Sequence, residues 1–280
     1  MLYSPGDQPD LLTKAFDTDA DTLIFDLEDS VSPGNKPTAR DNVRSLRDDI
    51  RAQDREIAVR INDMRTDWWA ADIEAAVAAG VDTIRLPALE SVWEVRTAVE
   101  TAAQHAPEGT LEFGVGLETP RGLFAGREIA TYAGRTDAVT FLSYGNADYT
   151  TAIGAPEPTE GILDHLRFFG ASFASIAQVD PVATAYLDVR DEAGLRDAAE
   201  RNRAYGFVGM SAIHPGQVPI INDLFTPDRA AVKRARRMVE AFDESESDSI
   251  MVDDEFLDRP VAERYRRLLD RDAAIRERGG

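Results

Sequence analysis

The sequence predicts an α/β protein in which eight parallel strands close into a (β/α)8 TIM barrel, followed by a short C-terminal helical lid extension. Short runs of β-branched and apolar residues alternate with longer amphipathic stretches, the pattern of a parallel sheet covered by helices. Eight such runs occur between Leu2 and Ile213, which suits a barrel of about 250 residues. No glycine-rich phosphate loop follows the first run, which disfavours the competing interpretation, an open doubly wound sheet.

Each predicted strand is short and is followed by a polar segment. The eight predicted strands are Leu2–Ser4, Thr22–Leu27, Ile57–Ile61, Thr83–Leu86, Glu112–Leu117, Ala138–Ser143, Ala177–Pro181 and Val208–Ile213. The amphipathic stretches between them carry helix-end signals, such as Ser91 at a start and Gly80 and Gly206 at two ends. The predicted helices are Asp67–Ala79, Ser91–Gln104, Thr119–Ala133, Glu160–Ile176 and Asp191–Tyr205.

The segment after the eighth strand predicts a smaller unit. Two further helices are expected over Val218–Leu224 and Pro227–Phe242, so the barrel domain is predicted to cover residues 1–242. Asp243–Ser249 is acidic and rich in serine, which favours a flexible hinge. With Ile250–Leu257 and a helix over Arg259–Arg278, residues 243–280 are predicted to form the hinge and lid.

The composition excludes several classes of function. The formal net charge is −20, which argues against nucleic acids and anionic membranes as partners. Cysteine is absent, so disulfides, thiolate catalysis and cysteine metal sites are excluded. No apolar run approaches the roughly 20 residues that span a bilayer, and we expect a soluble, cytoplasmic protein. Acidic residues spread along the whole length are typical of proteins that work in a salty cytoplasm, as in halophilic archaea. The alternative is an acidic protein from a GC-rich genome.

Oxygen ligands dominate the ends of the predicted strands, where barrels place their active sites. Glu118 follows the fifth strand and Asp148 lies just after the sixth. Because these strands are neighbours, their carboxylates are expected to converge and to bind a divalent ion such as Mg²⁺. Glu28 and Asp29 follow the second strand, and negative charges this close together require a neighbouring cation or arginine. For Asp29, capping of the next helix is an alternative of equal weight.

One arginine and one histidine complete the strand-end residues. Arg60 lies inside an apolar strand pattern, so a carboxylate or an anionic ligand is expected beside it. His214 ends the eighth strand and is the histidine placed near the barrel mouth; an orienting hydrogen bond is the structural alternative. The chain has no Gly-x-Ser-x-Gly elbow and no His-x-x-x-His pair, so hydrolase and zinc-protease interpretations lack support.

These strand ends also resemble the citrate lyase β-subunit-like branch of the HpcH/HpaI aldolase family, which includes malyl-CoA, methylmalyl-CoA and citramalyl-CoA lyases. Nine short pieces match in family order across nearly the whole chain. They are Leu2–Gly6, Phe25–Val31, Lys36–Arg40, Val59–Asn62, Leu86–Pro87, Leu117–Thr119, Gly145–Tyr149, Ile213–Pro215 and Phe256–Pro260.

The resemblance implies a Mg²⁺-dependent carbon–carbon lyase (with Mn²⁺ as a possible substitute) acting on an acyl-CoA and a small 2-oxo acid. Glu118 and Asp148 look like the family's metal ligands, and Arg60 looks like the residue that stabilises a thioester enolate. Glu28 and Asp29 look like acids that order the metal's waters and Arg60.

The matching pieces imply further roles. Asp258 looks like an acid/base residue donated to a neighbouring subunit, which implies a homo-oligomer, a trimer or a hexamer. Lys36, Arg40, Pro87 and His214 are the remaining predicted substrate-binding residues.

The chain departs from the family pattern at two places. The arginine and serine that usually precede the first strand and help to hold CoA are missing, and Asn146-Ala147 replaces the commoner Ala-Glu before Asp148. A citryl-CoA lyase-type β subunit and a non-catalytic barrel that binds metal or CoA therefore stay open as alternatives. A phosphoenolpyruvate-utilising barrel lyase is a further rival, against which the absence of a cysteine-bearing catalytic loop counts.

Overall fold

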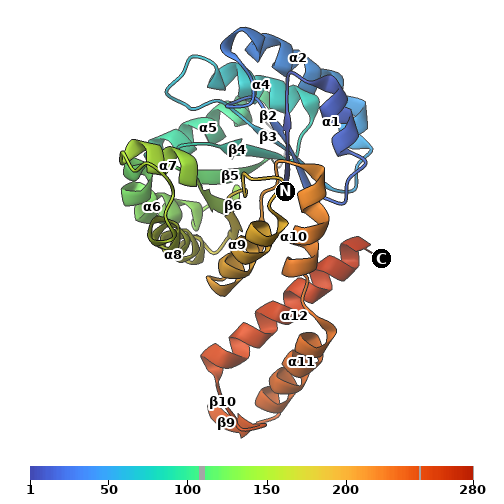
Figure 1. Cartoon of the computed structure of the whole chain (residues 1–280), viewed down its shortest axis with the longest axis vertical. Helices are drawn as coiled ribbons and strands as arrows, with labels where there is room; N and C mark the ends of the chain where they lie inside the picture. The colour runs from blue at the N-terminus through green and yellow to red at the C-terminus, as the bar shows by residue number, and fades with distance from the viewer. Residues whose placement is uncertain (107–110, 246, 280) are drawn as a thin grey trace. The chain divides into compact units, whose positions relative to one another are not determined.

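Eight parallel strands in sequence order form a curled sheet, consistent with a (β/α)8 barrel-like fold. The computed structural model describes residues 1–106, 111–245 and 247–279. A parallel bridge joins Leu2 in the first strand to Ala212, which follows the eighth, and the Tyr3 N–H donates to the Ala212 carbonyl at 2.9 Å. The two ends of the sheet are thus hydrogen-bonded to each other. Figure 1 shows these eight strands at the centre of residues 1–221 and the helices outside them.

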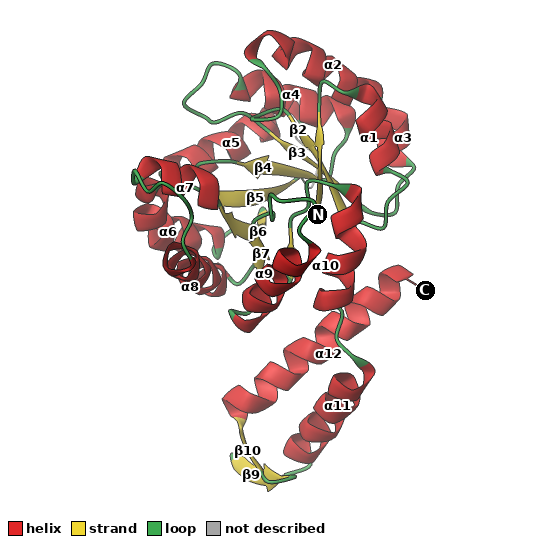
Figure 2. Ribbon diagram, viewed as in Figure 1, coloured by secondary structure: helices red, strands yellow, loops and turns green. Residues whose placement is uncertain are grey.

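Strands and helices alternate along residues 2–225, as Figure 2 shows by colour. The strands are β1 (Leu2–Pro5), β2 (Thr22–Asp26), β3 (Glu56–Arg60), β4 (Thr83–Leu86), β5 (Glu112–Leu117), β6 (Val139–Tyr144), β7 (Asp180–Ala183) and β8 (Gly209–Met210). The α-helices are α1 (Pro9–Ala15), α2 (Lys36–Ser45), α3 (Arg47–Arg51), α4 (Trp69–Ala79), α5 (Val92–His105), α6 (Pro120–Ala133), α7 (Asn146–Ala152), α8 (Glu160–Ala177), α9 (Glu192–Ala204) and α10 (Val218–Phe225). Two 3-10 turns, η1 (Pro33–Asn35) and η2 (Pro215–Gln217), precede α2 and α10.

Local sequence signals account for several of these boundaries. All five residues of β2 are buried, as expected for a parallel strand covered on both faces. Helix α4 ends at Gly80, which takes the left-handed conformation (φ 74°) that glycine adopts without steric cost. Ser91 caps α5 by accepting from the Glu94 N–H, and the Glu94 side chain bonds back to the cap.

Two predicted strands are misplaced or too long. The seventh strand begins at Asp180 and not at Ala177, because α8 continues through Ala177 and ends at Gln178 in the left-handed conformation (φ 58°). Gln178 is not a residue whose sequence signals such a helix end. The eighth strand is confined to Gly209–Met210, followed by the single bridge at Ala212.

The chain divides into two compact units, Met1–Ile221 and Asn222–Gly280. The second contains α11 (Arg229–Asp243), a hairpin of β9 (Ser249–Val252) and β10 (Glu255–Asp258), and α12 (Arg259–Gly279). The predicted domain boundary after residue 242 stays a prediction; α11, which that prediction assigns to the barrel domain, packs against α12 around a separate core. This core is formed by Ala235, Met238, Leu257 and Tyr265. Residue 246 of the predicted hinge lies outside the described residues.

Candidate active site

The register of the sheet places three charged residues side by side on β2, β3 and β4. Asp26 is the register partner of Arg60, and Arg60 is the partner of Arg85. Because alternate residues of a strand face opposite sides, register partners share one side of the sheet. An acid and two arginines therefore form a row near the carboxyl ends of these strands.

Arg60 is surrounded by carboxylates. Its Nε and Nη2 donate to the two Asp26 oxygens, each at 2.6 Å, in a bidentate pair. Its Nη1 lies 2.9 Å from Glu28 Oε2 and 3.4 Å from Asp29 Oδ2. The guanidinium also lies over the Tyr3 ring, 5.0 Å from the ring centroid. The partner carboxylate predicted for this strand arginine is thus present, and the structure brings Glu28, Asp29 and Arg60 together.

Arg85 is a site residue that sequence reasoning missed. Its Nη2 donates to Glu118 Oε1 and, at 3.3 Å, to Ser143 Oγ, and the ion pair is buried. Gly116 makes room for this pair, since a Cβ there would lie 2.7 Å from Glu118 Oε1 and 3.0 Å from Arg85 Nη2. The available signal was an arginine inside the apolar run Thr83–Leu86, the same signal that identified Arg60.

Glu118 lies against the loop that leads to Asp148. The Gly145 N–H donates to the Leu117 carbonyl at 3.1 Å, and this bond aligns the ends of β5 and β6. Gly145 directly precedes α7, and Asp148 lies in the first turn of that helix. Glu118 is buried, whereas Asp148 is exposed. The sequence did not predict α7, which sets the position of Asp148.

Replacing Gly145 by alanine is expected to displace Glu118. A Cβ at this position would lie 2.7 Å from Glu118 Cγ and 2.8 Å from its Cβ, closer than van der Waals contact allows. We expect a loss of about 1–3 kcal/mol in unfolding free energy, as for other overpacked sites, together with weaker metal binding. Thermal unfolding and Mn²⁺ titration measure the two effects. Gly161→Ala is the matched control, because the nearest atom to its added Cβ lies 4.0 Å away. Equal behaviour of both variants would contradict this prediction.

The charges of this cluster act on one another's protonation. Burial alone would raise the pKa of Asp26, but the charge and hydrogen bonds of Arg60, with those from Ser30 and Glu28, lower it to about 2. Burial raises the pKa of Glu28 to about 9, with repulsion from Glu118 and Asp29 adding to the effect and Arg60 opposing it. Asp148 is exposed as a residue, but partial desolvation of its carboxyl group, with repulsion from Glu118 and Asp29, raises its pKa. A nearby cation would stabilise the ionised form of both acids whose pKa is raised.

The cluster fits a hard divalent cation. Five carboxylates (Asp26, Glu28, Asp29, Glu118 and Asp148) face two guanidinium groups, which gives a formal net charge of −3. Glu28 Oε2 is buried and lies 2.9 Å from Arg60 Nη1, but it accepts no hydrogen bond of good geometry. The donors are all oxygen atoms, as Mg²⁺ prefers. Within the described ranges, no group of three or more His, Asp or Glu side chains forms a ready metal cage. Such a cage is not required, since Mg²⁺ is commonly held by one or two carboxylates and completed by substrate and water.

The other residues predicted to bind substrate have protein contacts or lie at the surface. Lys36 is buried and donates to the Leu27 and Glu28 carbonyls, both at 2.7 Å, so it holds the loop after β2. Arg40 pairs with the buried Asp72 at 2.9 Å. Pro87 is buried just after β4, and the exposed His214 accepts from the Gly216 N–H at 3.0 Å.

Asp258 lies in the second unit, at the end of β10. Its carboxylate accepts from the Val261 N–H at 3.1 Å and so caps the first turn of α12. This contact is local and leaves the predicted acid/base role untested.

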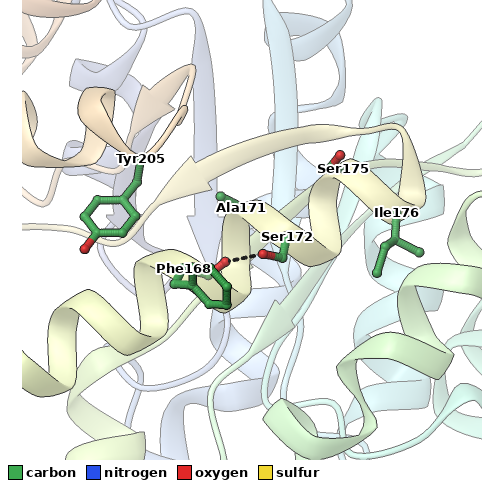
Figure 3. A pocket seen from close by; sticks show the side chains of 6 residues that line it. All are labelled: Phe168, Ala171, Ser172, Ser175, Ile176 and Tyr205. Atoms are coloured by element: carbon green, nitrogen blue, oxygen red, sulfur yellow. Dashed lines mark hydrogen bonds between the residues drawn. The ribbon is translucent and has the colours of Figure 1, made fainter. Parts of the chain in front are cut away.

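A pocket of about 470 Å³ lies away from these residues, on the outer side of α8 near the end of α9. Figure 3 shows Phe168, Ser172 and Ile176 along α8, with Tyr205 nearest the Phe168 end. The Ser172 hydroxyl donates to the Phe168 carbonyl of its own helix. No charged side chain lines this pocket, so it lacks the groups that acid–base or metal chemistry needs.

The chain belongs to the HpcH/HpaI aldolase/citrate lyase family, whose model matches residues 1–215. It is 31% identical over 283 residues to the citrate lyase subunit beta of Escherichia coli (strain K12), covering 97% of this chain and 92% of that protein. It is also 31% identical over 275 residues to the L-malyl-CoA/beta-methylmalyl-CoA lyase of Rhodobacter capsulatus, covering 89% of this chain and 85% of that protein. These relatives are enzymes, of the citrate lyase and malyl-CoA lyase types.

A solved structure supports the same relationship. The fold is similar to that of CitE from Mycobacterium tuberculosis in complex with magnesium, acetoacetate and coenzyme A. The TM-score is 0.79 and the sequence identity 28%, with 97% of each chain covered. None of the helices in the described part of the chain has the length and apolar character that crossing a membrane requires.

Proposed function

We propose that this protein is a Mg²⁺-dependent carbon–carbon lyase that cleaves or forms a 3-hydroxy-carboxyacyl-CoA such as malyl-CoA or methylmalyl-CoA. Cleavage of malyl-CoA yields acetyl-CoA and glyoxylate, and cleavage of methylmalyl-CoA yields propionyl-CoA and glyoxylate. Pyruvate is the oxo acid released where citramalyl-CoA is the substrate. The observation that carries the proposal is the joint position of Arg60, Arg85 and the five carboxylates at the carboxyl ends of neighbouring strands. The relatives' names support the substrate class, and the magnesium and coenzyme A bound to the similar solved structure support both ligands.

Glu118 and Asp148 are the proposed Mg²⁺ ligands. When bound, Mg²⁺ polarises the carboxylate and adjacent oxygen of the 2-oxo acid or of its 2-hydroxy acid adduct. Glu28 and Asp29 lie beside Arg60, and we propose that they order water near the ion. Lys36, Arg40, Pro87 and His214 are the proposed substrate-binding residues. Lys36 also donates to the Leu27 and Glu28 carbonyls, and Arg40 pairs with Asp72.

Arg60 and Asp258 are the proposed catalytic residues. In the cleavage direction the hydroxyl group transfers its proton to water, and the carbon–carbon bond breaks to leave the carbonyl group of the oxo acid. The electron pair of that bond remains on the thioester as an enolate. Arg60 stabilises the negative charge on the enolate oxygen. Asp258 then donates a proton to the enolate carbon, which completes the acyl-CoA product. We propose that Asp258 comes from a neighbouring subunit of a homo-oligomer, a trimer or a hexamer.

Asp258→Asn is expected to lower kcat by about 10²–10⁴, the range for general acid–base catalysis, with no change in thermal stability. Asparagine caps helices as well as aspartate does, so the contact with the Val261 N–H survives while the acid is lost. Steady-state assays and thermal unfolding check both parts.

A second experiment tests whether Asp258 is donated to the site of a neighbouring subunit. Unfolded Asp258→Asn and Glu118→Gln chains are mixed and refolded together. Recovery of activity is expected, and its absence would contradict donation of Asp258 to a partner.

The reaction itself is tested with purified protein in high-salt buffer. Malyl-, methylmalyl-, citramalyl- and citryl-CoA are supplied with and without chelator, and the oxo acid, the acyl-CoA and free CoA are all measured. We expect chelator-sensitive cleavage of malyl-CoA or methylmalyl-CoA. Stabilisation by glyoxylate and Mg²⁺ without turnover of any acyl-CoA would instead identify a non-catalytic binding protein.

A citryl-CoA lyase-type β subunit is the second candidate. The citrate lyase subunit beta of Escherichia coli aligns with 97% of this chain, against 89% for the malyl-CoA lyase of Rhodobacter capsulatus. Preferential cleavage of citryl-CoA in the same assay would select this candidate.

A further inference from the structure

Arg85 has a contact that a metal at Glu118 would disturb. Its Nη2 donates to Glu118 Oε1, and this ion pair is almost inaccessible, with side-chain exposures of 6% for Arg85 and 4% for Glu118. Ser143 Oγ accepts a second, longer bond from the same nitrogen, at 3.3 Å. The guanidinium therefore neutralises the carboxylate that we propose as a metal ligand.

Arg85 also has unused donor capacity. Its Nη1 is buried and has no hydrogen-bond partner in the structure. A buried guanidinium nitrogen without an acceptor is costly, and native structures usually satisfy such groups. Because a guanidinium fork matches a carboxylate, a substrate carboxylate could accept from both terminal nitrogens once Nη2 leaves Glu118.

The second arginine of the row has no such freedom. Arg60 already donates to both Asp26 oxygens at 2.6 Å and lies beside Glu28 and Asp29. Arg85 has Glu118 as its one ion-pair partner in the described structure. Arg85 can therefore change its ion-pair partner on ligand binding more readily than Arg60 can.

We infer that Arg85 exchanges partners during ligand binding: it pairs with Glu118 in the metal-free protein and with the carboxylate of the 2-oxo acid once Mg²⁺ has taken Glu118. This inference rests on the proposed function. Its first consequence is that Arg85 competes with the metal and weakens metal binding in the absence of substrate. Its second is that metal and oxo acid bind cooperatively, because each supplies a new partner for one member of the buried pair.

The test is a titration of Mn²⁺, with and without pyruvate, into wild-type protein and Arg85→Gln in high-salt buffer, followed by electron paramagnetic resonance. Without pyruvate, Arg85→Gln is expected to bind Mn²⁺ about tenfold more tightly, within the 5–150-fold range of common couplings. Pyruvate is expected to tighten Mn²⁺ binding severalfold less in Arg85→Gln than in the wild type.

Two further variants serve as controls. Arg85→Lys keeps the charge and should stay near the wild-type Mn²⁺ affinity without pyruvate. Arg167→Gln removes another buried arginine, paired with Glu160 and Asp164, and should leave both values unchanged.

An unchanged or weaker Mn²⁺ affinity of Arg85→Gln, or a pyruvate effect equal to that of the wild type, overturns the exchange while leaving the proposed function intact. Failure of the wild type to bind Mn²⁺ overturns both. A measurement that needs no variant is a crystal structure of the wild type with Mn²⁺ and pyruvate. Arg85 is expected to contact the pyruvate carboxylate there, and an Arg85 that still donates to Glu118 Oε1 refutes the exchange.

Discussion

Glu118→Gln is expected to abolish chelator-sensitive cleavage of the acyl-CoA substrate. Outer-shell partners of metal sites contribute about 10–100-fold to affinity or activity, so loss of a direct ligand should cost at least about a hundredfold in kcat/KM. Glutamine keeps the size of the side chain but removes the negative charge that Mg²⁺ requires. Steady-state rates at saturating Mg²⁺, together with Mn²⁺ titration, measure the loss.

The control for this variant must separate lost chemistry from lost stability. Glu118→Gln also leaves the buried Arg85 without its carboxylate, which for a buried pair costs about 3–5 kcal/mol in unfolding free energy. Activity is therefore compared only under conditions in which thermal unfolding shows the variant to be folded. Glu90→Gln is the matched variant: Glu90 pairs with Arg65 at 2.6 Å and accepts from Thr119, next to Glu118 in the sequence. Full turnover by Glu118→Gln would refute the metal assignment.

Arg60→Lys is expected to lower kcat by about 10²–10³ with a smaller change in KM. Loss of one donor to a developing oxyanion has this effect, since the interaction is strongest in the transition state. Lysine keeps the charge but lacks the fork that holds both Asp26 oxygens, so the cation is no longer fixed beside the enolate. Steady-state kinetics on the preferred acyl-CoA separate the two parameters.

Arg65→Lys provides the comparison for Arg60→Lys. Arg65 also forms ion pairs, with Asp63 and Glu90, but it lies on the loop after β3 and is 45% exposed. We expect its replacement to leave kcat within a factor of two to three, as for a surface ion pair. A similar rate for both lysine variants would show that Arg60 is not a catalytic residue.

The fold could be predicted well because its signals are local. Apolar runs gave the positions of most strands, and caps such as Ser91 and Gly80 gave helix ends close to those observed. The errors arose where local signals are weak. The last turn of α8 reads as a strand because nothing in its sequence marks Gln178 as a left-handed helix end. The packing of α11 on α12 depends on contacts between segments that are distant in sequence, so no local signal predicts it.

The site was predictable only where a single strand carried the signal. A charged residue inside an apolar run made Arg60 a candidate, and acids at strand ends made Glu28, Asp29, Glu118 and Asp148 candidates. The partners of these residues depend on sheet register, which pairs Asp26 with Arg60 and aligns Arg85 beside them. Register is a property of the assembled sheet. The ion pair between Arg85 and Glu118 therefore emerged only from the structure.

The central claim is that one metal ion is held between Glu118 and Asp148 and faces Arg60. An anomalous difference map from crystals soaked in Mn²⁺ tests this most directly. We predict one strong peak at metal–ligand distance, about 2.1 Å, from an oxygen of each carboxylate. A peak bound to other residues, or to one of these acids without the other, would contradict the claim.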